Sequence, residues 1–256
     1  MALKPHDYDA SDQHQAYRQG RAMPATMLAR WMEVFGEIWS PARPLSLIDL
    51  GSGTGRLTPG LAEAFGGPVF GVEPSANMRA EAERGSAHPA VSYLAGEAAA
   101  IPRPDASADG VLTFLSFHHV KDRPAAAREI ARVLKPGGRL IMRSNFRERM
   151  PDDIWWHRYF PRALAIEQAY FPSVAEVEAA FAGAGLKPLG LTEVQEWFYD
   201  EADDAVARLK LKTVTTFEHF TPAEIEEGFA RLDAEAAAGT FKLPAPQRSD
   251  LLVFEA

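Results

Sequence analysis

The chain has 256 residues, 46% of them hydrophobic, with a formal net charge of −8 and no cysteine. This acidic balance argues against a nucleic-acid partner, which usually needs a basic face, and the lack of cysteine excludes disulfides and thiolate metal sites. Residues 1–13 lack the apolar stretch of a secretion signal, and no apolar run approaches the ~18 residues of a membrane span. We therefore expect a cytoplasmic protein without a nucleic-acid or membrane partner.

In the first part of the chain, helical and strand patterns alternate. After a polar segment over 1–21, one apolar face recurs over 24–39, which predicts a helix. Strands are expected over 45–50, 68–73, 91–94, 109–115 and 139–146, with helices over 57–65, 75–84 and 122–134 between them. Nearly continuous apolar strands separated by amphipathic helices are typical of a parallel sheet covered on both faces. This part is predicted to form a doubly wound, Rossmann-like α/β core.

The second part is less regular. Residues 147–172 are dense in aromatic side chains and arginine, and 200–245 contain a capping-box pattern at Thr221-Pro222-Ala223-Glu224, followed by apolar residues at helical spacing. We expect these two segments to be lid-like insertions. The other segments are predicted as a helix over 173–185 and strands over 186–199 and 248–256.

Residues 48–55 read Ile-Asp-Leu-Gly-Ser-Gly-Thr-Gly and lie between an apolar strand pattern and an apolar helical pattern. A strand, a glycine turn and a helix let backbone N–H groups approach a nucleotide-like ligand without a Cβ in the way. A dinucleotide fingerprint needs its third glycine at the position of Arg56, because the pyrophosphate lies on that helix N-terminus. Gly55 comes one position earlier and the acid Asp49 lies upstream, so the pattern favours a ligand with an amine and no phosphate.

Several sequence blocks, in the same order along the chain, carry a resemblance to a known family. They are LIDLGSGTG (47–55), GVEPSANM (71–78), GEAAAIP (96–102), ADGVLTFLSFHHV (108–120) and EIARVLKPGGRL (129–140). With these blocks the chain resembles class I S-adenosylmethionine-dependent methyltransferases, and within them the small-molecule group of the ubiquinone and menaquinone C-methyltransferases. The resemblance implies a seven-strand sheet whose last strand is antiparallel, in a single domain over 1–256. Within it, an N-terminal helical segment (1–40) would cover the cofactor, 45–146 would bind it, and 147–172 and 200–245 would lie on the acceptor side.

The resemblance implies S-adenosylmethionine as the cofactor and S-adenosylhomocysteine as its product. Glu73, 22 residues after Gly51, would accept hydrogen bonds from both ribose hydroxyls, and Glu97 would accept one from the adenine amine. Asp49 would help to hold the methionine ammonium, or would only cap the following helix. Arg21 would pair with the methionine carboxylate, or would be a solvated surface arginine.

The glycine loop and the strand ends would supply the other cofactor contacts. The loop backbone would approach the methionine portion, the N–H of Ala98 would bond the adenine ring, and Met78 would pack on that ring or belong to the core. Phe114 and Leu115 would lie near the sulfonium or pack in the core. The complete set of expected cofactor residues is Tyr17, Arg21, Asp49, Gly51, Ser52, Gly53, Thr54, Gly55, Glu73, Pro74, Met78, Gly96, Glu97, Ala98, Phe114 and Leu115.

The reaction expected from the resemblance is an in-line displacement at the sulfonium methyl, in which the protein mainly aligns the reactants and excludes water. His118 follows the fourth strand at the edge where ligands bind, so it is the candidate general base, with a structural histidine as the alternative. We expect no metal, because the adjacent His118 and His119 point in different directions and no carboxylates at ligand spacing accompany them.

The acceptor is expected to be a small organic molecule with an oxygen, nitrogen or carbon nucleophile. No run typical of nucleic-acid amino methylases follows the fourth strand, and the chain is acidic. The aromatic insertion would form the acceptor pocket or only a packing cap, while nearby arginines would meet an acceptor carboxylate or phosphate. The expected acceptor residues are Arg143, Asn145, Trp155, Trp156, Tyr159 and Tyr170. The alternatives are a protein that binds the cofactor without catalysis, and a different reaction, such as cyclisation, with the same cofactor.

Overall fold

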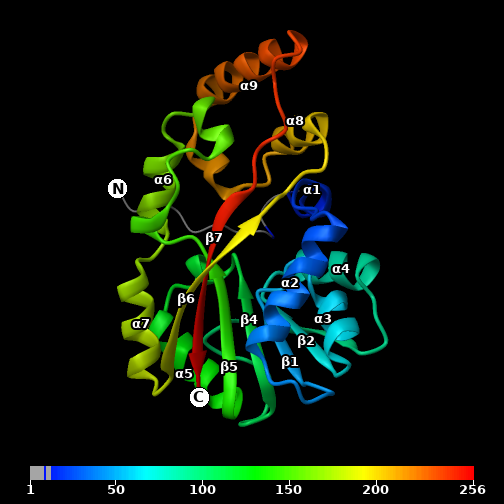
Figure 1. The fold of residues 1–256 in the computed structure, drawn as a ribbon, viewed down its shortest axis with the longest axis vertical. Helices are drawn as coiled ribbons and strands as arrows, with labels where there is room; N and C mark the ends of the chain where they lie inside the picture. Colours follow the sequence, from blue (N-terminus) through cyan, green and yellow to red (C-terminus); the bar gives the residue numbers. More distant parts are fainter. Residues whose placement is uncertain (1–8, 10–12) are drawn as a thin grey trace.

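The predicted sheet is present in a computed structural model, which describes residue 9 and residues 13–256. Over these residues the strands pair in the order β3-β2-β1-β4-β5-β7-β6 (Figure 1). The last strand of the chain, β7, is antiparallel to β5 and β6, and the other pairs are parallel. The strands are β1 (Leu47–Leu50), β2 (Val69–Glu73), β3 (Val91–Ala95), β4 (Ala108–Phe114), β5 (Leu134–Ser144), β6 (Lys187–Glu196) and β7 (Gln247–Glu255). The predicted topology is therefore confirmed.

Helices cover both faces of the sheet, so β1 is buried along its whole length and β4 at every residue except Asp109. On one face, α2 (Ala25–Ile38) and α3 (Thr58–Phe65) bury their apolar stripes with Trp31, Leu61 and Phe65. On the other face, α5 (Arg123–Val133) and α7 (Val174–Gly183) do the same with Ile130 and Phe181. A further helix, α4 (Ala76–Gly85), lies beside β2 and β3.

The strand order reverses between β1 and β4, and this places a crevice at the carboxyl ends of these strands. The glycine loop follows β1 directly, since Leu50 is the last residue of that strand. β2 ends at Glu73 and β4 ends at Phe114. Three segments that carry candidate site residues therefore meet at one edge of the sheet. The topology therefore positions the candidate site.

Beyond that edge the two insertions pack on each other and form what we call the lid (Figure 1). It comprises residues 147–172, with α6 (Ala163–Tyr170), and residues 200–245, with α8 (Ala202–Lys210) and α9 (Pro222–Ala237). Its buried apolar side chains form a cluster of their own: Trp156, Tyr159, Phe160, Ala163, Ile166, Val206, Leu209, Phe217, Phe220 and Leu232. We call this set the lid cluster.

Two local features differ from the sequence expectations. A helix, α1 (Gln13–Gly20), lies within the polar segment over 1–21, where the apolar pattern predicted none. Arg18 ties it to the end of α4 through the carbonyls of Glu81 (2.8 Å) and Gly85 (2.9 Å). β5 begins at Leu134, so the Pro136-Gly137-Gly138 turn lies within the strand, where Gly137 N–H donates to the carbonyl of Ala256 (2.9 Å). The parts of the expected N-terminal segment at 1–8 and 10–12 lie outside the described residues.

Candidate functional site

Two cavities adjoin at the carboxyl edge of the parallel strands. The first, the glycine-loop cleft, has a volume of about 530 Å³ and is lined by the ends of β1, β2 and β4 and by the loop itself. Its size lies within the usual range of small-molecule sites. The second, the lid chamber, has a volume of about 130 Å³ and lies between that edge and the lid. Tyr17, Leu115 and His119 line both cavities, so these residues mark the junction between them.

The glycine loop is held tightly against its neighbours. Gly51 and Gly55 have φ angles of 76° and 75°, which side chains rarely adopt. A Cβ at Gly51 would lie 2.4 Å from the Cβ of Ser116, and one at Gly55 would lie 2.2 Å from the hydroxyl of Tyr93. These two glycines are therefore required by the packing of the loop, and Gly51, Ser52, Gly53 and Thr54 line the cleft.

Glu73 ends β2 and lines the glycine-loop cleft, with 6% of its surface exposed. One carboxylate oxygen accepts a hydrogen bond from Gly53 N–H and the other accepts one from Ser75 N–H, each at 3.0 Å. Burial raises the pKa of Glu73, and the two backbone donors oppose that rise. The carboxylate thus stiffens the glycine loop and keeps acceptor capacity for donors of a ligand.

Asp49 lies under the loop and is 3% exposed. Its carboxylate accepts a hydrogen bond from the Thr58 hydroxyl at 2.7 Å. Burial raises the pKa of Asp49 to about 6, against the opposing effects of Thr58 and Arg56. It does not cap α3, whose N-cap residue Leu57 has no side-chain cap hydrogen bond. Asp49 is therefore a buried acid whose ionised form a cationic group in the cleft would stabilise.

The far end of the cleft is lined by five residues that the sequence predicts at the cofactor: Pro74, Met78, Gly96, Glu97 and Ala98. Met78 also packs in the interior, since it is only 2% exposed. Its methyl group would lie 3.6 Å from a Cβ placed on Gly53, so it borders the loop directly. Met78 therefore lines the cleft and also packs in the interior, and its contact with an adenine ring stays a prediction.

Two residues expected at the cofactor lie elsewhere. Arg21, just after α1, lines the lid chamber and an outer groove behind the loop, and it does not line the cleft. Gly55 also faces that groove. Two contacts hold Arg21 outside the cleft. Arg18, one turn earlier, anchors α1 by donating to the carbonyl of Thr54 at 3.2 Å. The backbone carbonyl of Arg21 accepts a hydrogen bond from the Arg56 guanidinium at 2.8 Å.

Arg56 lines the glycine-loop cleft and was missed as a site residue. Burial lowers its pKa to about 10, and the neighbouring charge of Arg21 contributes, so it remains cationic at neutral pH. Its guanidinium lies 5.3 Å from the ring centroid of Phe114. Within residues 13–256 and at residue 9, no carboxylate lies within 4.0 Å of it. A partly buried cation without such a partner fits an anionic group in the cleft. Its place directly after Gly55 is the signal that could have revealed it.

The end of β4 forms the wall between the two cavities. Phe114 packs edge-to-face on Trp31, with ring centroids 5.1 Å apart, and it lines the cleft. Leu115 follows with a φ of 52°, in the left-handed region that a branched side chain rarely adopts. Such strain costs about 1–3 kcal/mol and is found mainly at functional sites. Its position at the junction of the cavities agrees with that pattern.

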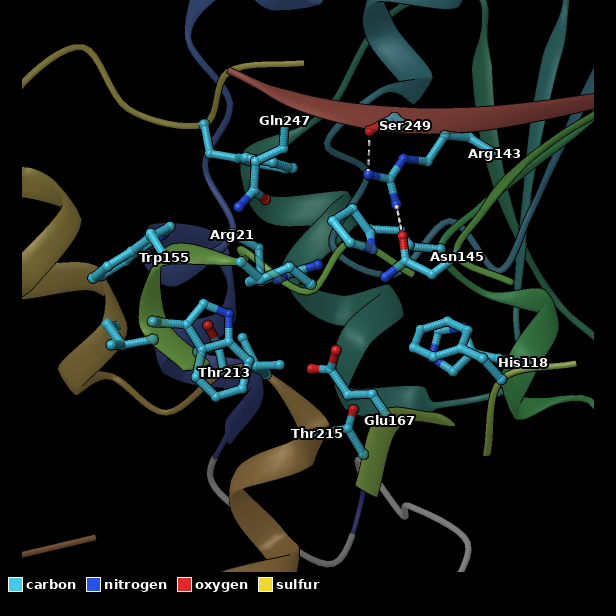
Figure 2. Close-up of a pocket in the computed structure, with 18 of the residues that line it drawn as sticks. Arg21, His118, Arg143, Asn145, Trp155, Glu167, Thr213, Thr215, Gln247 and Ser249 are labelled. Atoms are coloured by element: carbon cyan, nitrogen blue, oxygen red, sulfur yellow. Dashed lines mark hydrogen bonds between the residues drawn. The ribbon is translucent and has the colours of Figure 1, made fainter. Parts of the chain in front are cut away.

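His118 lines the lid chamber and not the cleft (Figure 2). Its ring lies 4.4 Å from that of Phe171 and 5.6 Å from that of Tyr170. Burial lowers the pKa of His118 well below its usual value, and the charges of His119, Arg21 and nearby arginines add to this. The imidazole is therefore neutral at physiological pH. Its Nδ1 is buried and has no hydrogen-bond partner among the described residues.

Arg143 does not present a free cation to the chamber. Its guanidinium forms an ion pair with the fully buried Glu196 and donates to the Ser249 hydroxyl at 2.7 Å (Figure 2). Trp31 Nε1 donates to the same carboxylate at 3.2 Å. Asn145, also at the chamber, lies 3.5 Å from Arg143 Nη1. The buried Arg143–Glu196 ion pair and its hydrogen bonds hold the chamber wall in place, because breaking a buried ion pair is costly. Arg147 and Arg149, the other arginines considered for the acceptor, pair with Glu176, Glu193 and Asp250.

Trp155, Trp156 and Tyr170 line the lid chamber, whereas Tyr159 lines neither cavity. The ring of Tyr159 belongs to the lid cluster, and its hydroxyl donates to Glu235 at 2.6 Å. Other lining residues were not expected from the sequence: Glu167, Phe198, Tyr199, Thr213, Thr215, Gln247 and Ser249. Most of them come from segments on either side of α8 and from β7, which only the folded lid and the antiparallel return bring to the chamber.

Two classes of feature are absent from the part of the chain that the structure describes. It holds no group of three or more histidine, aspartate or glutamate side chains that could bind a metal ion. None of its helices combines the length and the apolar character that a bilayer crossing requires.

Known proteins share this arrangement. A family model described as a methyltransferase domain matches residues 48–142. An O-methyltransferase of Penicillium expansum is 30% identical over 162 residues, covering 61% of this chain and 57% of the relative. The ubiquinone/menaquinone biosynthesis C-methyltransferase of Rubrivivax gelatinosus is 34% identical over 131 residues, covering 51% of this chain and 49% of the relative. Over residues 48–142 the chain therefore has a methyltransferase domain, which is similar to class I S-adenosylmethionine-dependent methyltransferases.

The methyltransferase-family fold extends over nearly the whole chain. A crystal structure from Anabaena variabilis, described as a methyltransferase from an antibiotic biosynthesis pathway, covers 93% of this chain and 99% of its own, with a TM-score of 0.73 and 20% identity. The chain spans about half the length of the two curated relatives above. The matched residues 48–142 contain the glycine loop, Glu73 and β4, whereas the lid lies beyond them.

Proposed function

We propose that this protein transfers a methyl group from S-adenosylmethionine to a small organic acceptor. The observation that carries the proposal is the set of charges around the glycine-loop cleft. Two buried acids, Asp49 and Glu73, lie at the ends of neighbouring strands, and the partly buried cation Arg56 lines the same cavity. A zwitterionic amino-acid group joined to a ribose needs these charges, and a nicotinamide dinucleotide needs a phosphate site that this loop lacks.

The residues of the cleft fit that cofactor. Glu73 would accept from the ribose hydroxyls, Asp49 would offset the ammonium, Arg56 would pair with the carboxylate, and Glu97 with the Ala98 N–H would hold the adenine. When bound, the cofactor supplies a methyl group on a positively charged sulfur that leaves with the bonding electrons. The protein's own contribution is alignment and water exclusion, and good alignment is worth about 7–11 kcal/mol of barrier.

The lid chamber is proposed as the acceptor site, because it adjoins the cleft at Tyr17, Leu115 and His119. Asn145, Trp155, Trp156 and Tyr170 would contact the acceptor there, and Arg143 would hold the wall in place. The neutral His118 would remove a proton from an acceptor that arrives protonated.

Two measurements test the proposal. Isothermal titration should show binding of S-adenosylhomocysteine to the wild-type chain, and absence of binding would refute the cofactor assignment. Incubation with S-adenosylmethionine and a library of small acceptors should yield a product heavier by one methylene group. Cofactor binding with no product would favour a binding protein without catalysis, and a product of unchanged mass would favour a cyclisation.

A further inference from the structure

The lid chamber contains a carboxylate that the proposed reaction does not use. Glu167 lies on α6, is 4% exposed, and directs its carboxylate toward the chamber (Figure 2). One oxygen accepts a hydrogen bond from the Thr216 hydroxyl at 2.8 Å. The other lies 3.3 Å from His157 Nε2, which makes no hydrogen bond with it. Of the described residues that line the chamber, Glu167 is the one carboxylate.

No lysine or arginine within the described ranges has a nitrogen within 4.0 Å of the Glu167 carboxylate. Three arginines line the chamber. Arg143 pairs with Glu196 and Arg248 lies 3.4 Å from Glu193, while Arg21 forms no ion pair with Glu167. An ionised carboxylate has about four acceptor positions, and one hydrogen bond fills only part of that capacity. Burying an ionised carboxylate away from water is costly unless hydrogen-bond donors or a cation fill its remaining acceptor positions. A bound molecule is in position to do so.

The walls around Glu167 also suit a cation. Trp155, Tyr170, Phe171 and Tyr199 line the chamber with aromatic rings. Aromatic faces attract ammonium groups, and this attraction strengthens where water is excluded. The volume of about 130 Å³ lies below the range usual for drug-sized ligands, so the chamber suits a small acceptor such as one ring with a short side chain.

We infer that the acceptor carries a protonated amine in addition to its nucleophile, and that Glu167 binds this amine within the aromatic walls. The inference rests on the proposed function. The ammonium donates to the free oxygen positions of Glu167, which leaves the other end of a molecule of this size to reach the junction at Leu115. Glu167 is then a residue that determines acceptor specificity, in a part of the chain beyond the matched domain.

The test uses three phenols that differ mainly in side-chain charge: tyramine is cationic, 4-ethylphenol is neutral, and 4-hydroxyphenylacetate is anionic. Each is titrated calorimetrically into the full chain saturated with S-adenosylhomocysteine. We expect tyramine to bind at least about tenfold more tightly than the other two. Glu167→Gln should abolish this preference while leaving the affinity for S-adenosylhomocysteine unchanged. Glu226→Gln, which removes an exposed carboxylate from α9, is the matched control and should keep the preference.

Tyramine that binds the wild type no better than 4-ethylphenol, or not at all, would overturn the inference. A preference that survives in Glu167→Gln would do the same. If Glu167→Gln does not fold, the wild-type ranking of the three phenols decides, together with Glu167→Asp, which keeps the charge and should keep the preference. A chain that fails to bind S-adenosylhomocysteine refutes the proposed function, whereas one that binds it without favouring tyramine refutes only the role of Glu167.

Discussion

Replacing Arg56 by glutamine removes a partly buried positive charge from the glycine-loop cleft. A hydrogen bond to a charged group contributes about 1.5–3 kcal/mol. The loss of one such contact with the methionine carboxylate should weaken binding of S-adenosylhomocysteine roughly 10- to 150-fold. The estimate applies here because the guanidinium lines the cleft and no described carboxylate lies within 4.0 Å of it, so the variant leaves no buried protein acid without its partner.

The assay is isothermal titration of wild type and Arg56→Gln with two ligands. S-adenosylhomocysteine has the amino-acid portion, and 5′-methylthioadenosine lacks it but keeps the adenosine and the sulfur. We expect the variant to lose affinity for the first and to keep its affinity for the second. Arg84→Gln, an exposed arginine of α4, controls for net charge. Equal weakening of both ligands would mean that Arg56 only shapes the loop, and unchanged affinity for both would remove it from the site.

Three further predictions concern the acids and the histidine. Glu73→Ala should weaken cofactor binding at least about tenfold by calorimetry, because it removes a charged acceptor from the cleft, and unchanged affinity would discard the ribose assignment. His118→Ala should lower turnover of an ionisable acceptor about 10²- to 10⁴-fold at neutral pH, and near-normal turnover would make the histidine structural. Burial raises the pKa of Asp49 from 3.8 to about 6, so folding favours its protonated form and the free energy of unfolding should fall by up to about 3 kcal/mol as pH rises from about 4 to 6. Urea titrations at several pH values should show this fall for wild type and a flatter profile for Asp49→Asn, and parallel profiles would contradict the buried titration.

The sequence was sufficient for the fold because its signals are local. Apolar runs defined the strands, Gly66 ended α3 in the left-handed conformation as expected, and Ser75, Asp122 and Thr221 cap their helices. The methyltransferase domain and the topology are confirmed. The roles of the individual site residues stay predictions.

What the sequence could not supply depends on packing between distant segments. Arg21 and Arg18 lie one turn apart, and only the tertiary bonds of Arg18 to α4 decide which of them reaches a cavity. Glu167 lies on a helix whose buried face is defined by the other insertion, so its direction could not be read from spacing. Arg143 has the right type and position for anion binding, but Glu196, 53 residues away, takes its charge.

The lid cluster shares no residue with the two clusters that flank the sheet. Substitutions that repack it leave the hydrophobic layers beneath the glycine-loop cleft intact. Under the proposed function, the preference for one acceptor over another can therefore change during evolution while binding of the methyl donor is kept. A chimaera that exchanges both insertions together is then the natural unit for changing specificity.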